Sequence, residues 1–197
     1  MLLCVHDSPY YSEEEITELI KKDPWMMKVL RAAEELNLPD WWIGAGFLRN
    51  KVWNHMEGKD AEQTRDADLV YFNKDDTAQE TDWAYDDKMA KEHPFAGWEI
   101  RNQARMHYKN GFEPFDSTAD GIAHWTETAT CVAVRMRQGS LEYLFCHGPD
   151  DLFNLIARPG PYCRSEARKT LEGKVARPTS HNRVILGCLR RRSYPHE

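Results

Sequence analysis

The sequence lacks any apolar run of the roughly 20 residues that a membrane-spanning helix needs. Its first residues, MLLCVHDSPYYSEEE, become polar too soon to form the apolar centre of a secretory signal. A CxxC pair is also absent, since the five cysteines are scattered along the chain. We therefore expect a soluble, cytoplasmic protein with free thiols, and neither a membrane partner nor a zinc site.

The composition also argues against a disordered chain. Hydrophobic residues make up 41% and charged residues 29% of the 197 residues, which is ordinary for a globular protein. A chain of this length fits a single domain with its own core. No internal repeat or low-complexity segment divides it.

Charge is distributed unevenly along the chain. Residues 158–197 contain 10 Lys and Arg against 3 Asp and Glu, a net charge of +7, whereas residues 1–157 have 16 against 29, or −13. We predict a main domain over residues 1–160 and a basic extension over residues 161–197. The extension could bind phosphates of a ligand or nucleic acid, or pack across the acidic body as a salt-bridged segment, which we favour.

Hydrophobic spacing and capping residues predict the secondary structure. Ser12 with Glu15 forms a capping box, and Asp23 followed by Pro24 starts a second helix that ends near Asn37. Further helices are expected after residue 46, over residues 78–93 and from residue 151, and strands within residues 41–47, 66–73, 98–103, 131–137 and 141–147. This order of helices and strands indicates an α+β or α/β domain.

The pair Asp66 and Asp68 is the first candidate for a chemical site. These residues lie two apart on a predicted strand, so their side chains leave the same face of it. Two carboxylates in that arrangement can bind one Mg²⁺ or Mn²⁺ ion. An acid-x-acid sequence alone decides little, because acidic residues at strand edges are often merely solvated.

The glycines in the run Gly44-Ala45-Gly46 are a second candidate, because they end one predicted strand and start a helix. Glycine lets the backbone approach a ligand closely, and the N-terminus of the following helix offers N–H groups to a phosphate. Arg49 and Asn50 would project from the first turns of that helix and could contact the same phosphate-bearing ligand. The alternative is a tight turn with close packing between strand and helix.

Glu99, on the predicted strand 98–103, would complete a set of three carboxylates. Two metal ions held by such a trio can bridge the attacking oxygen and the departing pyrophosphate of a phosphoryl transfer. Glu99 could instead be an exposed strand residue paired with Arg101 or Arg105.

The residues that follow Glu99 could line the same cleft. Arg105 could bind phosphate through its planar guanidinium group, and Asn102 could orient a substrate hydroxyl or a base. For both, a structural role is the alternative. His107 is better explained as a hydrogen-bonded structural residue than as a catalytic base.

Two polar groups flank the predicted hairpin. Trp125, Glu127 and Thr128 could shape the pocket of an acceptor, although a cluster of loop and cap residues is the simpler interpretation. Asp150 and Asp151 are expected to be structural, because adjacent carboxylates point in different directions and a helix follows them.

Four segments together resemble a known family. WWIGAGFLRNKVWN, TRDADLVYFN, WEIRNQARMH and DDLFNLIARP look like the small, mainly bacterial nucleotidyltransferase family of the DNA polymerase beta superfamily. The pattern of that family is a glycine turn, an acid-x-acid strand and a later acidic strand. The resemblance extends over about residues 23–160.

The resemblance implies a minimal nucleotidyltransferase fold of the α+β class, in which helices pack against a mixed sheet. It also implies a Mg²⁺ or Mn²⁺ cofactor, and it assigns the phosphate-binding turn to Gly44 and Gly46, the metal-binding pair to Asp66 and Asp68, and the third acid to Glu99. Two features depart from the family. The turn reads GAG where glycine is usually followed directly by glycine or serine, and the third acid is Glu where Asp is frequent.

The leading functional hypothesis is a metal-dependent enzyme that transfers a nucleoside monophosphate from a nucleoside triphosphate (NTP) to an unidentified hydroxyl acceptor. One alternative is a catalytically inactive module of the same fold that senses nucleotides or binds a partner protein. Another is a nucleic-acid-binding protein that uses the basic extension.

Overall fold

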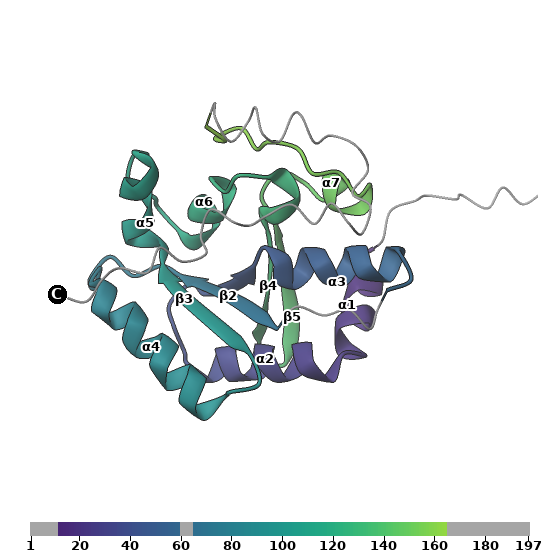
Figure 1. Cartoon of the computed structure of the whole chain (residues 1–197), viewed down its shortest axis with the longest axis horizontal. Coiled ribbons are helices and arrows are strands. Elements are labelled where there is room, and N and C mark those ends of the chain that lie inside the picture. Colours follow the sequence, from purple (N-terminus) through teal and green to yellow (C-terminus); the bar gives the residue numbers. More distant parts are fainter. Residues whose placement is uncertain (1–11, 60–64, 165–197) are drawn as a thin grey trace, which may run out of the picture.

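A five-stranded mixed sheet forms the centre of the structure (Figure 1), a computed structural model that describes residues 12–59 and 65–164. The strands are β1 (Trp42–Gly44), β2 (Asp66–Tyr71), β3 (Gly97–Asn102), β4 (Val132–Arg137) and β5 (Ser140–Phe145). The helices are α1 (Glu13–Lys21), α2 (Pro24–Glu35), α3 (Gly46–Met56), α4 (Gln79–Glu92), α5 (Gln103–Asn110), α6 (Thr118–Ala123), the 3₁₀ turn η1 (Thr128–Thr130) and α7 (Asp150–Phe153).

The strands lie in the order β3-β2-β1-β4-β5. The pair β2 and β3 is parallel, and α4 makes the crossover between them, whereas the pairs β1–β2, β1–β4 and β4–β5 are antiparallel. A mixed sheet with helices against it confirms the predicted α+β class.

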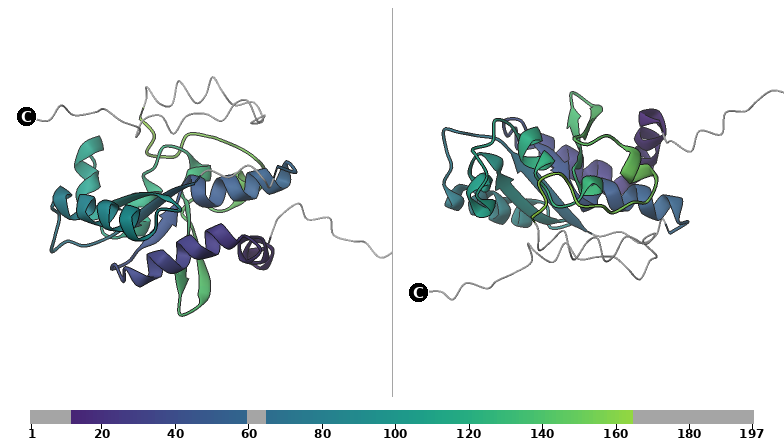
Figure 2. Two further views of the ribbon diagram at one scale, coloured as in Figure 1. Left: turned by 60° about the horizontal axis from the view of Figure 1, so that its bottom comes forward. Right: turned by 90° about the horizontal axis from the view of Figure 1, so that it is seen from above.

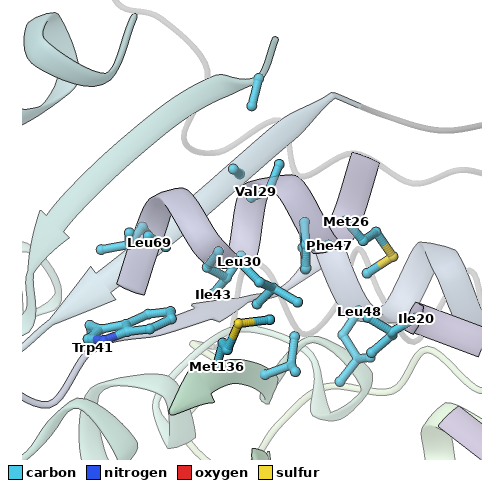
Figure 3. Packing of buried hydrophobic residues seen from close by; sticks show 14 of the residues in the cluster. Ile20, Met26, Val29, Leu30, Trp41, Ile43, Phe47, Leu48, Leu69 and Met136 are labelled. Atoms are coloured by element: carbon cyan, nitrogen blue, oxygen red, sulfur yellow. The ribbon is translucent and has the colours of Figure 1, made fainter. Parts of the chain in front are cut away.

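The first two helices begin at the predicted capping residues. Ser12 and Glu15 form a reciprocal capping box at α1, and the Asp23 carboxylate accepts hydrogen bonds from the N–H groups of Trp25 and Met26 at α2. The apolar faces of α1, α2 and α3 pack into one core with the sheet (Figure 3). In that core Leu30 and Ile43 are fully buried.

The β4–β5 hairpin turns at Gln138 and Gly139, both of which have positive φ angles, 51° and 78°. A two-residue loop with this backbone matches the right-handed twist of the paired strands. Figure 2 shows the hairpin extending past α2, and the backbone N–H of Gln138 donates to the Glu34 carboxylate of that helix at 2.8 Å. The predicted hairpin is therefore confirmed.

The two faces of the sheet are covered differently. Ile43, Leu69 and Ile100 belong to the large core on the side of α2, while Trp42 and Val70, which are neighbours across β1 and β2, pack with Ile122 of α6 on the other side. In Figure 1, α2 lies below the sheet and α6 above it. Because side chains alternate along a strand, Asp66, Asp68 and Glu99 share the α6 face with Trp42 and Val70.

The outer edge of β3 is bonded to α4. The backbone N–H of Ile100 donates to the Asp86 carboxylate at 2.7 Å, and that of Asn102 donates to both oxygens of Asp82 at 3.2 Å. Residues 82 and 86 are one helical turn apart, so both carboxylates face the strand. This edge of the sheet is therefore held by α4.

Two helices, α5 and α6, were not predicted. The first starts directly at the end of β3, with Asn102 as its N-cap, and the second is a six-residue helix capped by Ser117. Within the described ranges, no helix combines the length and the apolar character needed to cross a membrane. Most of the predicted extension 161–197 lies outside the described residues, so the proposed domain division stays a prediction.

Candidate active site

The parallel pairing of β2 and β3 places the predicted carboxylates side by side. Asp68 is opposite Glu99 in the register, and Asp66 is opposite Gly97. A Cβ atom on Gly97 would lie 3.3 Å from the Asp66 Oδ1 atom, so the missing side chain leaves room for this carboxylate over the neighbouring strand. The three acids therefore come from adjacent strands and share one face of the sheet.

Glu99 is also paired with a cation. Its carboxylate lies 3.5 Å from the Arg101 guanidinium group, which in turn lies 2.7 Å from the Asp86 carboxylate. Burial raises the pKa of Asp86, while the hydrogen bond from Arg101 acts in the opposite direction. The Glu99 side chain is 39% exposed, so it can rotate without disturbing the core. The structure therefore contains the Arg101 pairing that was the alternative to a metal-binding role.

The glycine turn adjoins these carboxylates. Antiparallel pairing sets Trp42 opposite Val70 and Ile43 opposite Leu69, and continuing the register by one residue sets Gly44 opposite Asp68. Gly44, Asp68 and Glu99 therefore form a row across β1, β2 and β3, which we call the central row. Residues directly opposite one another lie on the same face, so the glycine leaves space beside the acids.

Ala45, between the two glycines, has an unusual backbone. Its φ of 52° and ψ of −124° lie in a region that residues with a Cβ atom rarely adopt, and such strain costs on the order of 1–3 kcal/mol. Its N–H group donates to the Val132 carbonyl of β4 at 3.1 Å, which holds the turn to the sheet. Ala45 is the N-cap of α3, and its side chain makes no capping hydrogen bond.

Close contacts explain why both flanking positions are glycine. A Cβ atom on Gly44 would lie 2.5 Å and 2.7 Å from the Cη2 and Cζ3 atoms of Trp125, so a side chain here would require the indole to move. A Cβ atom on Gly46 would lie 3.0 Å from the Asn50 amide nitrogen. The structure therefore contains the close packing that was the alternative role for the glycines. Trp125 and Asn50 are the side chains that lie beside the turn.

Arg49 lies at the start of α3, with its guanidinium group held by two neighbours. The Nε and Nη2 atoms donate to the Asn50 side-chain oxygen at 3.2 Å and 3.1 Å, and Nη1 lies 3.5 Å from the Glu127 carboxylate. Both members of the Arg49–Glu127 pair have side chains that are only 10% exposed. Glu127, which was expected either to shape an acceptor pocket or to belong to a loop and cap cluster, therefore lies beside the helix that follows the glycine turn.

Asn102 lies on the opposite face of the sheet from the central row. It is fully buried, and its side-chain oxygen accepts hydrogen bonds from the N–H groups of Asn73 and Ala104 at 3.0 Å. Its amide nitrogen donates to the carbonyl oxygens of Asn73 and Asp76 at 2.7 Å. These four bonds join the end of β3 to the loop after β2, so we do not include Asn102 in the proposed site.

Arg105 is likewise engaged away from the carboxylates. It is 6% exposed and forms an ion pair and hydrogen bond with Asp82, whose carboxylate also accepts a hydrogen bond from the Tyr71 hydroxyl. Burial, followed by the hydrogen bond to Asp82, raises the pKa of Tyr71. Arg105 thus balances a buried charge, and we also leave it out of the proposed site.

Thr128, Asp151 and His107 are the remaining candidates. The Thr128 hydroxyl donates to the Asp151 carboxylate, and Asp151 also forms an ion pair with Arg158 at 2.7 Å. These contacts join η1 to α7, which agrees with the structural role expected for Asp151. His107 has a buried Nδ1 atom with no hydrogen-bond partner in the described part of the chain and packs 6.1 Å from the Phe115 ring.

The carboxylates suit a hard divalent cation by their chemistry. Mg²⁺ and Mn²⁺ prefer carboxylate oxygens, and Asp66 and Asp68 supply two groups on one face beside the space left by Gly97. Over residues 12–59 and 65–164, however, no three His, Cys, Asp or Glu side chains are gathered closely enough to hold an ion as they stand. A third carboxylate would therefore require Glu99 to turn from Arg101 towards Asp68.

Comparison with known proteins agrees with this geometry. Residues 31–183 match a protein family described as nucleotidyltransferase. The chain belongs to this nucleotidyltransferase family. The matched segment contains the whole central row, the glycine turn and the Asp66–Asp68 pair, and no curated protein matches the sequence.

A solved structure supports the fold of this nucleotidyltransferase. It is an NMR structure described as revealing a CCA-adding enzyme head domain; it has 26% sequence identity and a TM-score of 0.71, and the match covers 85% of this chain and 90% of that one. A second structure, described as a tRNA-processing enzyme complex, has 18% identity and a TM-score of 0.41, with 66% and 35% coverage. The first similarity shows the nucleotidyltransferase fold, and the second is too low to add to it.

Proposed function

We propose that this nucleotidyltransferase is an active, metal-dependent enzyme that transfers a nucleoside monophosphate from an NTP to a hydroxyl acceptor. The observation that carries the proposal is the central row, which sets a glycine turn and two carboxylates from three adjacent strands on one partly open face. A cytoplasmic location, where NTPs are available, is part of the same proposal.

Each group in the row has a proposed role. Asp66 and Asp68 would bind Mg²⁺ or Mn²⁺, and Glu99 would join them after leaving Arg101. A bound divalent ion neutralises charge on the phosphates and lowers the pKa of a coordinated hydroxyl. The first turn of α3, which begins at Gly46, would take a phosphate oxygen, and Arg49 would add positive charge near it.

The proposed reaction is a displacement at the α-phosphorus of the NTP. The acceptor hydroxyl loses its proton to solvent and its oxygen forms a bond to that phosphorus, while the bond from phosphorus to the bridging oxygen breaks and pyrophosphate leaves. Most of the rate enhancement would come from holding the two reactants in line and from balancing the charge of the phosphates. Residues on three strands of one sheet are suited to this task because the sheet fixes their spacing.

Calorimetry tests whether the nucleotide binds at this place. Binding of each of the four ribonucleoside triphosphates is measured with and without Mg²⁺ or Mn²⁺, on the native chain and on Asp68→Asn. We expect metal-dependent binding that the variant loses. As a matched control, Asp75→Asn removes the same charge from an exposed position in the loop after β2, and should leave binding unchanged.

Transfer itself is tested with NTPs labelled at the α-phosphate. CTP and ATP are the first donors to examine, because the solved relative is described as a CCA-adding enzyme head domain. Label in a hydroxyl-bearing product, with release of pyrophosphate, is the expected result. Metal-dependent binding without transfer to any acceptor would instead favour the inactive, nucleotide-sensing alternative.

Removal of the basic extension tests the remaining alternative, a nucleic-acid-binding protein. Nucleic-acid binding that weakens steeply with salt and disappears after removal of residues 165–197 would support a nucleic-acid-binding protein. Most of this extension lies outside the described residues, so its role stays a prediction.

A further inference from the structure

Trp125 is the aromatic side chain that lies directly on the glycine turn. The position of a Cβ atom on Gly44 would be 2.5 Å from Trp125 Cη2 and 2.7 Å from Cζ3, both on the outer edge of the six-membered ring. These outer atoms of the ring therefore contact the glycine turn. Gly44 belongs to the central row, and its Cβ position points to the face that holds Asp68 and Glu99. Because the indole contacts that position, it lies on the same face.

The backbone around Trp125 is held on several sides. Its N–H group donates to the Ile122 carbonyl at 3.0 Å, and the next residue, Thr126, accepts from the Gly160 N–H group at 2.8 Å. Glu127 follows, and its carboxylate lies 3.5 Å from Arg49 at the start of α3. The loop is thus tied to α6, to the segment after α7 and to the glycine turn, which places the ring before any ligand arrives.

A comparison with Trp42 shows why Trp125 is the ring available to a ligand. Trp42 lies on the same face, two residues before Gly44, but it is 7% exposed and the Arg135 guanidinium group covers it at 4.2 Å from the ring centre. Trp125 is only partly buried against the small cluster that contains Trp42 and Val70. It therefore keeps part of its apolar surface exposed.

The groups already assigned account for the phosphates of an NTP but not for its nucleoside. Carboxylates, a bound cation and the start of α3 recognise charge, whereas a base offers a flat apolar surface. Asp68 lies one strand spacing from Gly44, about 5 Å. The nucleoside of an NTP bound at the central row would thus come within reach of the ring that stands on Gly44.

We infer that Trp125 stacks on the base of the bound NTP and is the principal contact for the nucleoside. This inference rests on the proposed function, because it takes the phosphates to lie at the central row. Stacking uses the π-face that every base has, so the contact strengthens binding of purine and pyrimidine nucleotides alike. Selection among the four bases would then depend on other groups.

Substitutions at Trp125 test the inference by comparing ATP, CTP, GTP and UTP with inorganic tripolyphosphate, which carries the charge but no base. Trp125→Leu keeps an apolar side chain over Gly44 and removes the ring. We expect it to weaken Mg²⁺-dependent binding of all four NTPs by about 5- to 150-fold, with tripolyphosphate affinity unchanged. Trp125→Phe should restore most of the lost NTP affinity, since phenylalanine also stacks.

The control is Trp83→Leu, which removes an indole that is 49% exposed on α4. It should change the affinity neither for the NTPs nor for tripolyphosphate. Equal weakening of NTP and tripolyphosphate by Trp125→Leu would overturn the inference, because the ring would then only support the glycine turn. Unchanged NTP affinity in Trp125→Leu would overturn it as well.

Failure of the proposed function would look different. In that case the native chain would bind no NTP with Mg²⁺, or Asp68→Asn would bind it as well as the native chain does. The Trp125 series is therefore interpreted after that result, and a loss confined to the NTPs separates stacking from phosphate binding.

Discussion

Two acidic pairs lie beside β3, and they differ in their surroundings. Asp82 and Asp86 project from α4 onto the strand edge, where they accept backbone hydrogen bonds from Asn102 and Ile100 and form ion pairs with Arg105 and Arg101. Asp66 and Asp68 project from β2 onto the partly open face, in line with Glu99 and the glycine turn.

The spacing of the two pairs does not distinguish them. Residues 82 and 86 share a side of a helix as 66 and 68 share a side of a strand. The α4 pair, Asp82 and Asp86, is bonded to the backbone of β3, whereas the β2 pair, Asp66 and Asp68, lies on the face of the sheet that holds Glu99 and Gly44. Position in the sheet, rather than spacing, separates these structural carboxylates from those proposed to do chemistry.

The largest expected effect is on activity, at the β2 pair. Asp68→Asn should lower nucleotidyl transfer by about 10³-fold, because it removes a ligand of the cation that balances phosphate charge. Thermal unfolding should show that the variant stays folded, because Asp68 is only partly buried and lies outside the large core. Activity is measured by release of pyrophosphate, with Asp75→Asn as the control. A fully active Asp68→Asn enzyme would remove the distinction between the pairs.

The next effect is on stability, at the α4 pair. Asp82→Asn should lower the free energy of unfolding by about 3–5 kcal/mol, because it leaves the buried Arg105 without its counter-charge. Urea unfolding at neutral pH measures this change. Asp87→Asn removes an exposed charge from the same helix and should have almost no effect. Equal stability of the two variants would show that the buried ion pair contributes nothing net.

A smaller effect on stability is expected at the hydroxyl group of Tyr71, which also bonds to Asp82. Tyr71→Phe removes a 2.8 Å hydrogen bond and should cost about 1–2 kcal/mol at neutral pH. The pKa of Tyr71 is raised from its ordinary value of 10.0 by burial and by this bond. Above pH 10 the unfolded chain therefore loses the proton while the folded chain keeps it, so stability falls as pH rises.

Urea unfolding of the native chain and Tyr71→Phe between pH 8 and pH 11 tests the sign. The advantage of the native chain should be constant below about pH 10 and should shrink above it, because phenylalanine has no proton to lose. An advantage that grows with pH would contradict the raised pKa.

The smallest effect concerns the strained turn beside the β2 pair. Ala45→Gly should raise the free energy of unfolding by about 1 kcal/mol, because glycine adopts a positive φ at little cost. Ala133→Gly, in the ordinary strand backbone of β4, should instead lower it by a similar amount. Thermal unfolding of both variants makes the comparison, and destabilisation by both would show that Ala45 is not strained.

Local signals in the sequence predicted much of the fold. The capping box at Ser12, the Asp23–Pro24 start and the strand pattern in residues 66–73 depend on neighbours in the chain. Each element begins where these signals placed it, and the strand ends two residues earlier, at Tyr71. The helix α5 was missed because it begins without a loop directly after β3, capped by Asn102 within the strand itself. A strand that passes straight into a helix carries no turn signal.

The arrangement of the site depended on contacts that sequence spacing does not contain. The parallel neighbourhood of β2 and β3, and the insertion of β1 between β2 and β4, place Gly44, Asp68 and Glu99 in one row. Alternation along β3 could have indicated that Asn102 faces away from Glu99, since the two are three residues apart. The approach of Trp125 and Glu127 to the glycine turn is a tertiary contact with no sequence signature.

The carboxylates of α4 also affect how other molecules can approach the sheet. An uncovered edge strand offers N–H groups to the strand of another chain, and such pairing leads to aggregation or to recruitment of extended peptides. At β3 the donors of Ile100 and Asn102 are already bonded within the molecule. A partner strand would find these two donors occupied, and the proposed substrate would therefore approach the central row over the face of the sheet.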